Sequence, residues 1–185
     1  MLSFINGVNV NRLKQTVIAI ENEPGLGKFS FRVNNRWVQG AYNHSAIQGF
    51  SGGGQEDDTR KKPFIVGDDE PEILLGEDTE PNPAEFVLHA LAGCMTTAIV
   101  YHAAALGYHL EKVESRLTGN MDLHGFLGID PDTRNGYDQI SIQFTIEGDI
   151  TEQQKQEILQ FGPRFSPVFD ILTNKVPVSV KLAGN

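Results

Sequence analysis

The apolar positions of the chain recur with a period of two in some segments and with a helical period in others. The clearest alternation lies in QISIQFTIEG (139–148), where every second residue is apolar. Such alternation is typical of a strand with one buried face. LEKVESRLTGNMDL (110–123) and VPVSVKL (176–182) have a similar pattern, and PFIVG (63–67) is a short apolar run. We therefore expect strands at these four places.

The N-terminal half contains two β-prone segments, KFSFRV (28–33) and RWVQGAYNHSAI (36–47). Asn34 and Asn35 separate them, and asparagine tolerates the positive φ of a tight turn. The pattern predicts a β-hairpin with its turn at these two residues. The next segment, GFSGGGQEDDTRKK (49–62), has three consecutive glycines, a charge run and no apolar period, which predicts a mobile surface loop.

Helices are predicted at both ends of the chain. Apolar residues at helical spacing before Pro24 predict a short amphipathic helix near the N-terminus. TEQQKQEILQFG (151–162) predicts a second helix, because Thr151 and Gln154 form a capping box and Gly162 is a typical stop residue.

A longer helix is predicted to begin at Pro83. Asn82 is placed as its N-cap, and the carboxylate of Glu85 is placed to accept a hydrogen bond from the Asn82 amide. Gly107 is the expected end. No charged residue lies between Glu85 and Gly107, so this helix is apolar on every side. We expect a sheet and a second subunit to cover it.

The predicted order is helix, hairpin, strand, long helix, two long strands, two helices and a strand. This order indicates an α+β fold with antiparallel sheets and a long buried central helix, because no regular βαβ alternation occurs. The length of 185 residues predicts a single domain, 1–185, with residues 1–27 as an N-terminal helical extension.

Composition excludes several classes of partner. The chain has 24 acidic and 15 basic residues, a net charge of −9, so we expect no nucleic acid and no anionic membrane as partner. The uncharged long helix is long enough to span a bilayer, but His89, His102 and His109 in or beside it favour a buried helix instead. The N-terminus lacks a signal-peptide pattern, which predicts a cytoplasmic protein.

Cys94 is the one cysteine of the chain. It excludes an intramolecular disulfide, a CxxC pair and a multi-cysteine zinc site. The histidines show no HxxxH or HExxH spacing and GxSxG is absent, so we expect no metal, no cofactor and no serine hydrolase. Two interpretations of Cys94 stay open: an inert packing residue or a reactive thiol.

The segment LLGEDTEPNPAEFVLHALAGCMTTAIVYHAAALG (74–107) resembles the central segment of the OsmC/Ohr family of osmotically or peroxide-induced thiol proteins. The resemblance implies an OsmC-like fold, an intertwined homodimer with two interface sites, and Cys94 as the peroxidatic thiol. It also implies a small-molecule hydroperoxide or thiol as the reaction partner, and an arginine that stabilises the attacking thiolate. Among the N-terminal arginines we prefer Arg36 over Arg32 and Arg60, and Arg134 and Arg164 are further candidates later in the chain.

Two positions depart from the family pattern. Ser166 stands where the peroxidases of the family have a second, resolving cysteine, and it is also placed to cap the short helix SPVFDILTN (166–174). The family's catalytic glutamate aligns with Ala84, one residue before Glu85. In a regular helix Glu85 lies about 180° around and about 13 Å along the axis from Cys94, which favours capping over catalysis.

The sequence therefore supports two hypotheses about function. In the first, Cys94, assisted by Glu85 and Arg36, reduces organic hydroperoxides with the help of an external thiol. In the second, the protein keeps the fold without peroxidase turnover and binds a small apolar or thiol ligand. A thiol used only for reversible modification is a third possibility. The expected substrate pocket consists of Phe86, Leu91, Met95, Ala98 and Ser166.

Overall fold

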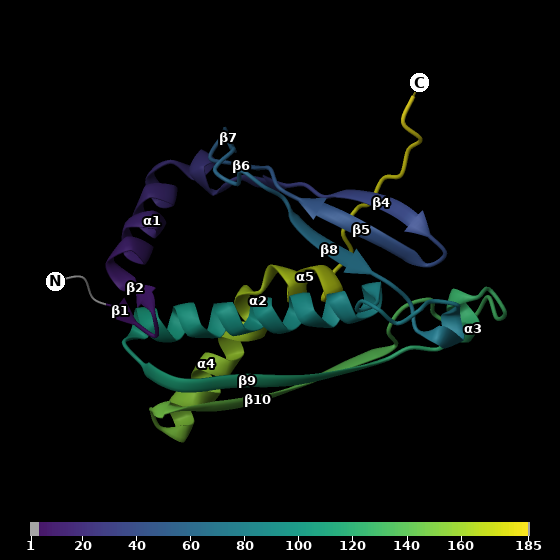
Figure 1. Ribbon diagram of the computed structural model, residues 1–185. Coiled ribbons are helices and arrows are strands. Elements are labelled where there is room, and N and C mark those ends of the chain that lie inside the picture. The colour runs from purple at the N-terminus through teal and green to yellow at the C-terminus, as the bar shows by residue number, and fades with distance from the viewer. Residues whose placement is uncertain (1–3, 185) are drawn as a thin grey trace. The chain divides into compact units, whose positions relative to one another are not determined.

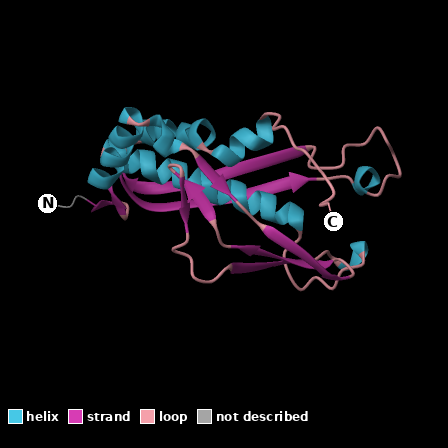
Figure 2. Cartoon of the chain, turned by 90° about the horizontal axis from the view of Figure 1, so that it is seen from above, coloured by secondary structure: helices cyan, strands magenta, loops and turns pink. Residues whose placement is uncertain are grey.

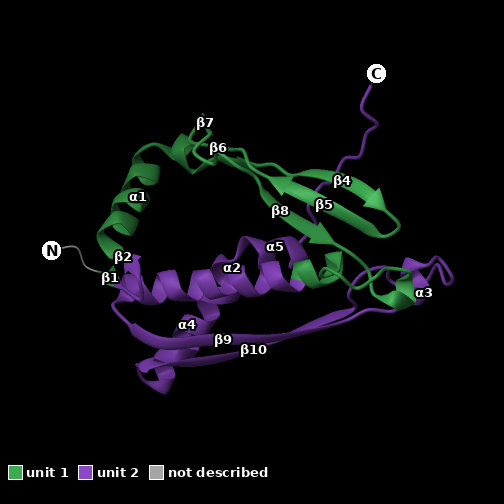
Figure 3. Cartoon of the chain, viewed as in Figure 1, with its two compact units in different colours: residues 1–4, 9–87 green, residues 5–8, 88–185 purple. Residues whose placement is uncertain are grey.

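The computed structural model describes residues 4–184, which form two compact units. Unit 1 holds Phe4 and residues 9–87, and unit 2 holds residues 5–8 and 88–184, as coloured in Figure 3. Both units combine helices with strands (Figure 2), and the pairings of the sheets β3-β6-β7, β4-β5-β8 and β9-β10 are all antiparallel. This confirms the prediction of a mixed fold with antiparallel sheets.

The first part of the chain is built from short strands and one longer helix, labelled in Figure 1. The elements are β1 (Phe4–Ile5), β2 (Val8–Asn9), α1 (Val10–Asn22), the 3-10 helix η1 (Pro24–Gly27), β3 (Phe29–Phe31), β4 (Asn34–Gln39), β5 (Tyr42–Ile47), β6 (Phe50–Gly52), β7 (Gln55–Asp57), β8 (Phe64–Asp68) and the 3-10 helix η2 (Glu72–Leu74). The strand predicted at 63–67 is thus confirmed as β8. So is the N-terminal helix: the Asn9 side chain accepts a hydrogen bond from the Arg12 amide at 2.9 Å and caps α1.

The predicted hairpin turn at Asn34 and Asn35 is wrong. Both residues lie inside β4, which pairs antiparallel with β5, and the chain reverses at Gly40. Gly40 has φ +53°, a conformation that glycine adopts without the steric cost of a Cβ atom. The turn therefore lies where glycine permits it, within the segment that the sequence pattern assigned to one strand.

The predicted mobile loop at 49–62 is also wrong in its central part. β6 and β7 pair antiparallel there, with Gly53 and Gly54 as the two turn residues. Their φ angles are +59° and +78°, and positive φ at both central positions is what a tight two-residue hairpin requires. The glycines terminate two short strands and do not make the segment irregular.

The second part of the chain contains the long helix and the longest strands. Its elements are α2 (Pro83–Leu106), β9 (His109–Asn120), α3 (Leu123–Phe126), β10 (Gln139–Asp149), α4 (Glu152–Phe165) and α5 (Pro167–Thr173). β9 and β10 form a two-stranded antiparallel sheet in which Leu117 faces Ile142 and Val113 faces Ile146, which confirms both predicted long strands. The short helix α3 was not predicted.

The start and end of α2 agree with the sequence signals. The Asn82 amide donates to the Glu85 carboxylate at 3.0 Å, and the Glu85 amide donates to the Asn82 side chain at 2.9 Å. This reciprocal pair is a capping arrangement that satisfies two amides at the helix start. Gly107, with φ +83°, follows the last helical residue.

The core of unit 2 lies between α2, α4 and the β9-β10 sheet. Ile99, Ala103 and Ile158 are fully buried at its centre, packed against half-buried side chains of both strands. The opposite face of α2 is less covered: Tyr101 is 48% exposed. Within the described chain α2 is thus buried on one face. Among the described helices, α2 alone is long and apolar enough to cross a membrane, but the core helices of globular proteins can have the same length and composition.

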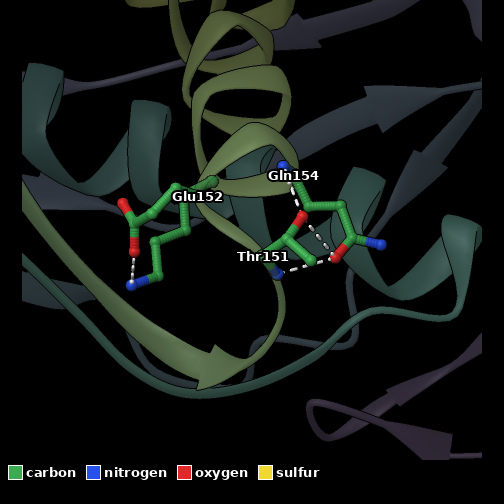
Figure 4. A network of polar contacts seen from close by, with 4 residues as sticks. Thr151, Glu152 and Gln154 are labelled. Carbon is green, nitrogen blue, oxygen red and sulfur yellow. Dashed lines mark hydrogen bonds and ion pairs between the residues drawn. The ribbon is translucent and has the colours of Figure 1, made fainter.

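The capping box of α4 is confirmed, and its predicted stop is wrong. The Thr151 amide donates to the Gln154 side chain at 2.8 Å, and the Gln154 amide donates to the Thr151 hydroxyl at 3.2 Å (Figure 4). The helix continues through Gly162 to Phe165. Gly162 is buried, and a Cβ atom there would lie 2.9 Å from the Met95 methyl group, so this glycine makes room for close packing between two helices.

The strand predicted at 176–182 is not formed within this chain. Val178, Val180 and Leu182 are 83%, 91% and 99% exposed, and no neighbouring strand pairs with their backbone. An extended segment becomes a strand only when another strand supplies hydrogen-bond partners. Residues 176–182 have the apolar alternation of a strand, but the described chain contains no strand that pairs with them.

Candidate functional site

Cys94 opens into a cavity of about 340 Å³ within unit 2. Cys94, Ala98 and Tyr101 lie on one face of α2, because spacings of four and seven residues return to the same side of a helix. The lining residues come from α2 and from the junction of α4 with α5: Gly93, Cys94, Thr97, Ala98, Tyr101, His102, Phe165 and Pro167. The thiol is half-buried, so a small molecule in the cavity can reach it.

An aromatic cluster forms one wall of this cavity. The His102 ring stacks on Phe165, with ring centroids 4.0 Å apart and planes 20° apart, and lies 4.9 Å from Phe161. The Arg164 guanidinium lies 5.0 Å from the centre of the Phe165 ring, within the range of a cation–π contact. The end of α4 is thereby held against the second half of α2.

Burial lowers the pKa of His102, and the positive charge of Arg164 lowers it further. Both effects disfavour the imidazolium and favour the neutral imidazole. A neutral imidazole offers one N–H donor and one nitrogen acceptor. Within residues 4–184 its nitrogens form no hydrogen bond, so they are available to a molecule in the cavity.

The Cys94 thiol likewise forms no hydrogen bond or ion pair within residues 4–184. Its neighbours in the cavity are mainly apolar, apart from the hydroxyl of Thr97 and the side chains of Tyr101 and His102. A thiol in such surroundings can react only if a positive charge stabilises its thiolate form. Unit 2 places no cation against the sulfur.

Ser166 is 2% exposed and lies between two residues of the cavity wall, Phe165 and Pro167. Its hydroxyl accepts a hydrogen bond from the Phe169 amide at 3.1 Å and caps α5, as the sequence predicted. The side chain is therefore adjacent to the cavity, and its oxygen already has a structural partner.

The other residues of the predicted pocket are distributed differently. Ala98 lines the cavity together with Cys94. Leu91 and Met95 are 2% and 5% exposed; they belong to the buried side of α2 and do not line the cavity. Phe86 lies in the first turn of α2, in the part of the helix that belongs to unit 1.

Glu85 and the N-terminal arginines predicted for the site lie in unit 1, whereas the two further candidates, Arg134 and Arg164, lie in unit 2. Glu85 caps α2, and Arg36 lies on β4 opposite His44 of β5. Arg32 forms two hydrogen bonds of 2.7 Å with Glu56, an ion pair that occupies its guanidinium. Neither Arg36 nor Arg60 forms an ion pair among the described residues. The Arg60 guanidinium lies 5.2 Å from the ring centres of two phenylalanines, Phe50 and Phe64.

A buried carboxylate organises the loop that precedes α2. Asp69 is 2% exposed and accepts hydrogen bonds from the amides of Glu70, Glu77 and Thr79 and from the Thr79 hydroxyl, at 2.9 to 3.1 Å. These bonds, those from Thr79 and Glu70 first, hold the pKa of Asp69 below its usual range. The carboxylate is saturated by the loop itself, and no group of three or more metal-ligating side chains occurs in the part of the chain that the structure describes.

Sequence reasoning missed the aromatic wall of the cavity. Thr97 and Tyr101 follow Cys94 at positions i+3 and i+7, so helical spacing alone was sufficient to place them beside the thiol. Phe165 and Pro167 lie some seventy residues further along the chain, and no local pattern links them to Cys94. Packing of α4 against α2 is what brings them together.

Comparison with known proteins places the chain in a family. The family model described as OsmC-like protein matches residues 76–181, which is more than half of the chain. The chain belongs to the OsmC-like protein family. This confirms the resemblance seen in the sequence, and the second cysteine of the family's peroxidases is indeed absent, since Cys94 is the only cysteine. No curated protein sequence gives a significant match.

Solved structures of OsmC-like proteins share the fold at low sequence identity. An OsmC like protein from Mycoplasma pneumoniae matches with a TM-score of 0.61 and 16% identity, over 79% of this chain and 89% of that one. The organic hydroperoxide resistance protein OsmC from Legionella pneumophila matches with a TM-score of 0.54 and 15% identity, over 77% and 88%. An OsmC-like protein of unknown function from Vibrio cholerae matches with a TM-score of 0.55 and 12% identity, over 76% and 92%.

The OsmC-like segment contains the whole of the Cys94 cavity. Cys94, His102, Phe165 and Ser166 all fall between residues 76 and 181, whereas Arg36 precedes the matched segment. The segment that matches the family model therefore includes the cavity and excludes Arg36.

Proposed function

We propose that this OsmC-like protein reduces organic hydroperoxides through Cys94, with an external thiol as reductant. The observation that carries the proposal is the half-buried Cys94 thiol at a mainly apolar cavity, on the helix that contains the family motif. An apolar cavity favours alkyl hydroperoxides over hydrogen peroxide, because apolar surface is removed from water on binding.

In the first step the Cys94 thiolate attacks the terminal oxygen of the hydroperoxide. The O–O bond breaks, an S–O bond forms, and the alkoxide takes up a proton and leaves as an alcohol. The cysteine sulfenic acid then condenses with an external thiol, releasing water and forming a mixed disulfide. A second thiol regenerates Cys94, so one hydroperoxide and two thiols give one alcohol, one water and one disulfide.

The need for an external thiol follows from the presence of a single cysteine in the chain. Peroxidases of this family resolve the sulfenic acid with a second cysteine, and Ser166 occupies that place here. A hydroxyl does not form the disulfide, and its oxygen already caps α5. The reaction therefore needs a compartment that supplies a small thiol, which is consistent with the cytoplasmic location that we propose.

Arg36 is the residue that we propose to stabilise the Cys94 thiolate, and Arg60 is its alternative. Both lack an ion-pair partner among the described residues, whereas the guanidinium of Arg32 is occupied by Glu56. Glu85 contributes as the cap that fixes the start of α2. Arg36→Gln should slow oxidation of Cys94, while Arg12→Gln, a matched change on the exposed surface of α1, should not.

We further propose that the protein acts as a homodimer. Two features of the single chain support this: the exposed face of α2, and the exposed apolar alternation at Val178, Val180 and Leu182. Both need a partner surface, and a second copy supplies them. Light scattering during gel filtration should give twice the chain mass, and truncation after residue 174 should lower it.

The function is tested by mixing reduced protein with a slight excess of cumene hydroperoxide, with and without dithiothreitol. We expect dithiothreitol to sustain peroxide loss, and mass spectrometry to find one added oxygen on Cys94 when the reductant is omitted. Cys94→Ser should abolish both signals. A thiol that stays reduced for hours with peroxide untouched would contradict the proposal.

A second function is favoured by Ser166 and by the lack of a cation beside Cys94 within unit 2. In this alternative the protein has no peroxidase turnover, and the cavity binds a small apolar or thiol ligand. The two functions differ in one measurement: a binding protein leaves the hydroperoxide concentration unchanged.

A further inference from the structure

We propose that Asn135 is a site of spontaneous modification, at which the side-chain amide is converted to an aspartyl or isoaspartyl carboxylate. The chain contains two Asn-Gly pairs, Asn6-Gly7 and Asn135-Gly136. The structure holds the first pair in place and leaves the second free, so the two pairs should differ in reactivity. This inference does not depend on the proposed function.

The reaction needs only water as a co-reactant. The main-chain nitrogen of the glycine attacks the side-chain carbonyl carbon of the asparagine, and a C–N bond forms. The amide group leaves with the glycine N–H proton as ammonia. Water then opens the cyclic imide at either carbonyl, which gives aspartate or isoaspartate. Glycine favours the ring closure because it has no Cβ atom beside the attacking nitrogen.

Asn6 cannot close this ring without breaking two hydrogen bonds. Its Nδ2 donates to the Tyr108 carbonyl oxygen at 3.0 Å, and its Oδ1 accepts from the Leu110 amide at 2.8 Å. Asn6 and Gly7 have φ angles of +53° and +76° and form the two-residue turn between β1 and β2. The Asn6 side chain thus takes the place of a strand partner at the start of β9, and folding should protect it.

Asn135 has none of these restraints. Its side chain is exposed and forms no hydrogen bond within residues 4–184. Both Asn135 and Gly136 lie outside helices and strands, in the connection between α3 and β10. Open space surrounds Gly136, where a Cβ atom would meet no heavy atom within 4 Å. The Asn135 side chain is therefore free to turn toward the Gly136 nitrogen.

The product carries an additional negative charge. Asp130, Asp132 and Asp138 lie in the same connection, and the chain already has a net charge of −9. The modified protein should bind more strongly to an anion-exchange column, which allows the two forms to be separated.

Isoaspartate also adds one carbon atom to the main chain, next to a close contact with α3. A Cβ atom at Gly125 of α3 would lie 2.6 Å from the Thr133 carbonyl oxygen and 2.5 Å from that of Arg134. The helix thus packs directly against the backbone that precedes Asn135. We expect the isoaspartyl form to loosen α3.

The test follows both asparagines in one sample. The folded protein is kept in a mildly alkaline buffer, the same protein is kept in concentrated urea, and peptide mass spectrometry measures the exchange of NH2 for OH at each asparagine. The unfolded chain gives the intrinsic reactivity of each pair, because the flanking residues are the same. We expect folding to slow the reaction of Asn6 about thirtyfold, the effect of two hydrogen bonds, and that of Asn135 less than about threefold.

Gly136→Ala is the matched control, because open space surrounds this position. Its methyl group shields the attacking nitrogen, so conversion at Asn135 should slow about tenfold or more, and that at Asn6 should not change. Equal protection of the two asparagines in the folded protein would overturn the proposal. So would an intact Asn135 in a sample in which Asn6 has reacted.

Hydrogen exchange of the separated isoaspartyl form tests the effect on α3. The Leu127 amide donates to the Leu123 carbonyl oxygen at 2.9 Å and reports on this helix. It should exchange faster in the isoaspartyl form, whereas the amide of Ile99 in the core should exchange as in the unmodified protein. Unchanged exchange at Leu127 would contradict the predicted loosening of α3.

Discussion

The His102 imidazole of α2 and the Phe165 ring at the end of α4 stack with their centroids 4.0 Å apart. This contact joins two helices that are distant in sequence and forms the wall of the cavity that Cys94 enters. Because Phe165 is still 42% exposed, its main contribution is to the shape of the cavity, and less to the burial of the core.

Phe165→Ala should therefore affect the site more than the fold. We expect the free energy of unfolding to fall by about 1–2 kcal/mol, from the lost aromatic pair and the lost apolar contact. Oxidation of Cys94 by cumene hydroperoxide should slow at the same time, because Phe165 lines the cavity. Phe126→Ala, an exposed phenylalanine of α3, is the control and should change neither quantity. Equal effects of the two variants would contradict the role of the stacked pair.

Stability should depend on the protonation of His102. Burial and Arg164 place its folded-state pKa below the ordinary value of about 6.5. The unfolded chain then binds more protons than the folded one between these two values, so the folded state loses stability as pH falls through this window. The contribution is fully present above about pH 6.5. Urea unfolding between about pH 7.5 and about pH 5.5 should show a smaller decrease for His102→Phe than for the wild type.

In the Ser166→Cys variant, the new cysteine should react with the Cys94 sulfenic acid and form a disulfide within the chain, in place of the external thiol. Ser166 lies between two cavity-lining residues, so a sulfur there is near the sulfenic acid of Cys94. After one equivalent of hydroperoxide, mass spectrometry should find the loss of two hydrogens in this variant, where the wild type gains one oxygen. Ser166→Ala is the control: it should keep the wild-type product and lose about 1 kcal/mol of stability, because the cap of α5 is removed. Persistence of a sulfenic acid in the cysteine variant would show that the sulfurs do not meet.

Gly148→Ala should strongly destabilise unit 2. A Cβ atom there would lie 2.3 Å from the His109 carbonyl oxygen and 2.9 Å from the Leu110 Cα, and both are backbone atoms with little freedom to move. The position also marks the register shift in the β9-β10 pairing. We expect a loss of roughly 1–3 kcal/mol in chemical unfolding. Gly136→Ala, which has open space around it, should be near neutral, and an equal loss there would contradict this explanation.

Local signals in the sequence were reliable where one residue and its near neighbours decide the structure. The capping pairs Asn82 with Glu85 and Thr151 with Gln154 marked helix starts correctly, because the bonds that satisfy helix amides are made within four residues. The alternation in β10 was equally clear, since every second residue is half-buried and Phe144 and Ile146 pack against the core of unit 2.

Several glycines were misread from the sequence, although Gly107 follows the end of α2 as expected. Gly40 makes a tight turn where a continuous strand was expected, and the Gly53-Gly54 pair makes one where a mobile loop was expected. Gly162, the expected helix stop, is a packing position inside α4. The same missing side chain permits a positive φ in one place and a close helix contact in another. Only the atoms around a glycine show whether it serves a tight turn or a close contact between helices.

The sequence by itself determined the family, the single thiol and the helix that carries it, because the motif around Cys94 and the absence of another cysteine are properties of the chain alone. The tertiary structure decided which residues surround that thiol. His102 had been assigned only a structural role, and Phe165 carried no signal at all. They became part of the site because α4 packs on α2 through the buried Ile99 and Ile158, and that packing depends on long-range apolar burial, which no local pattern encodes.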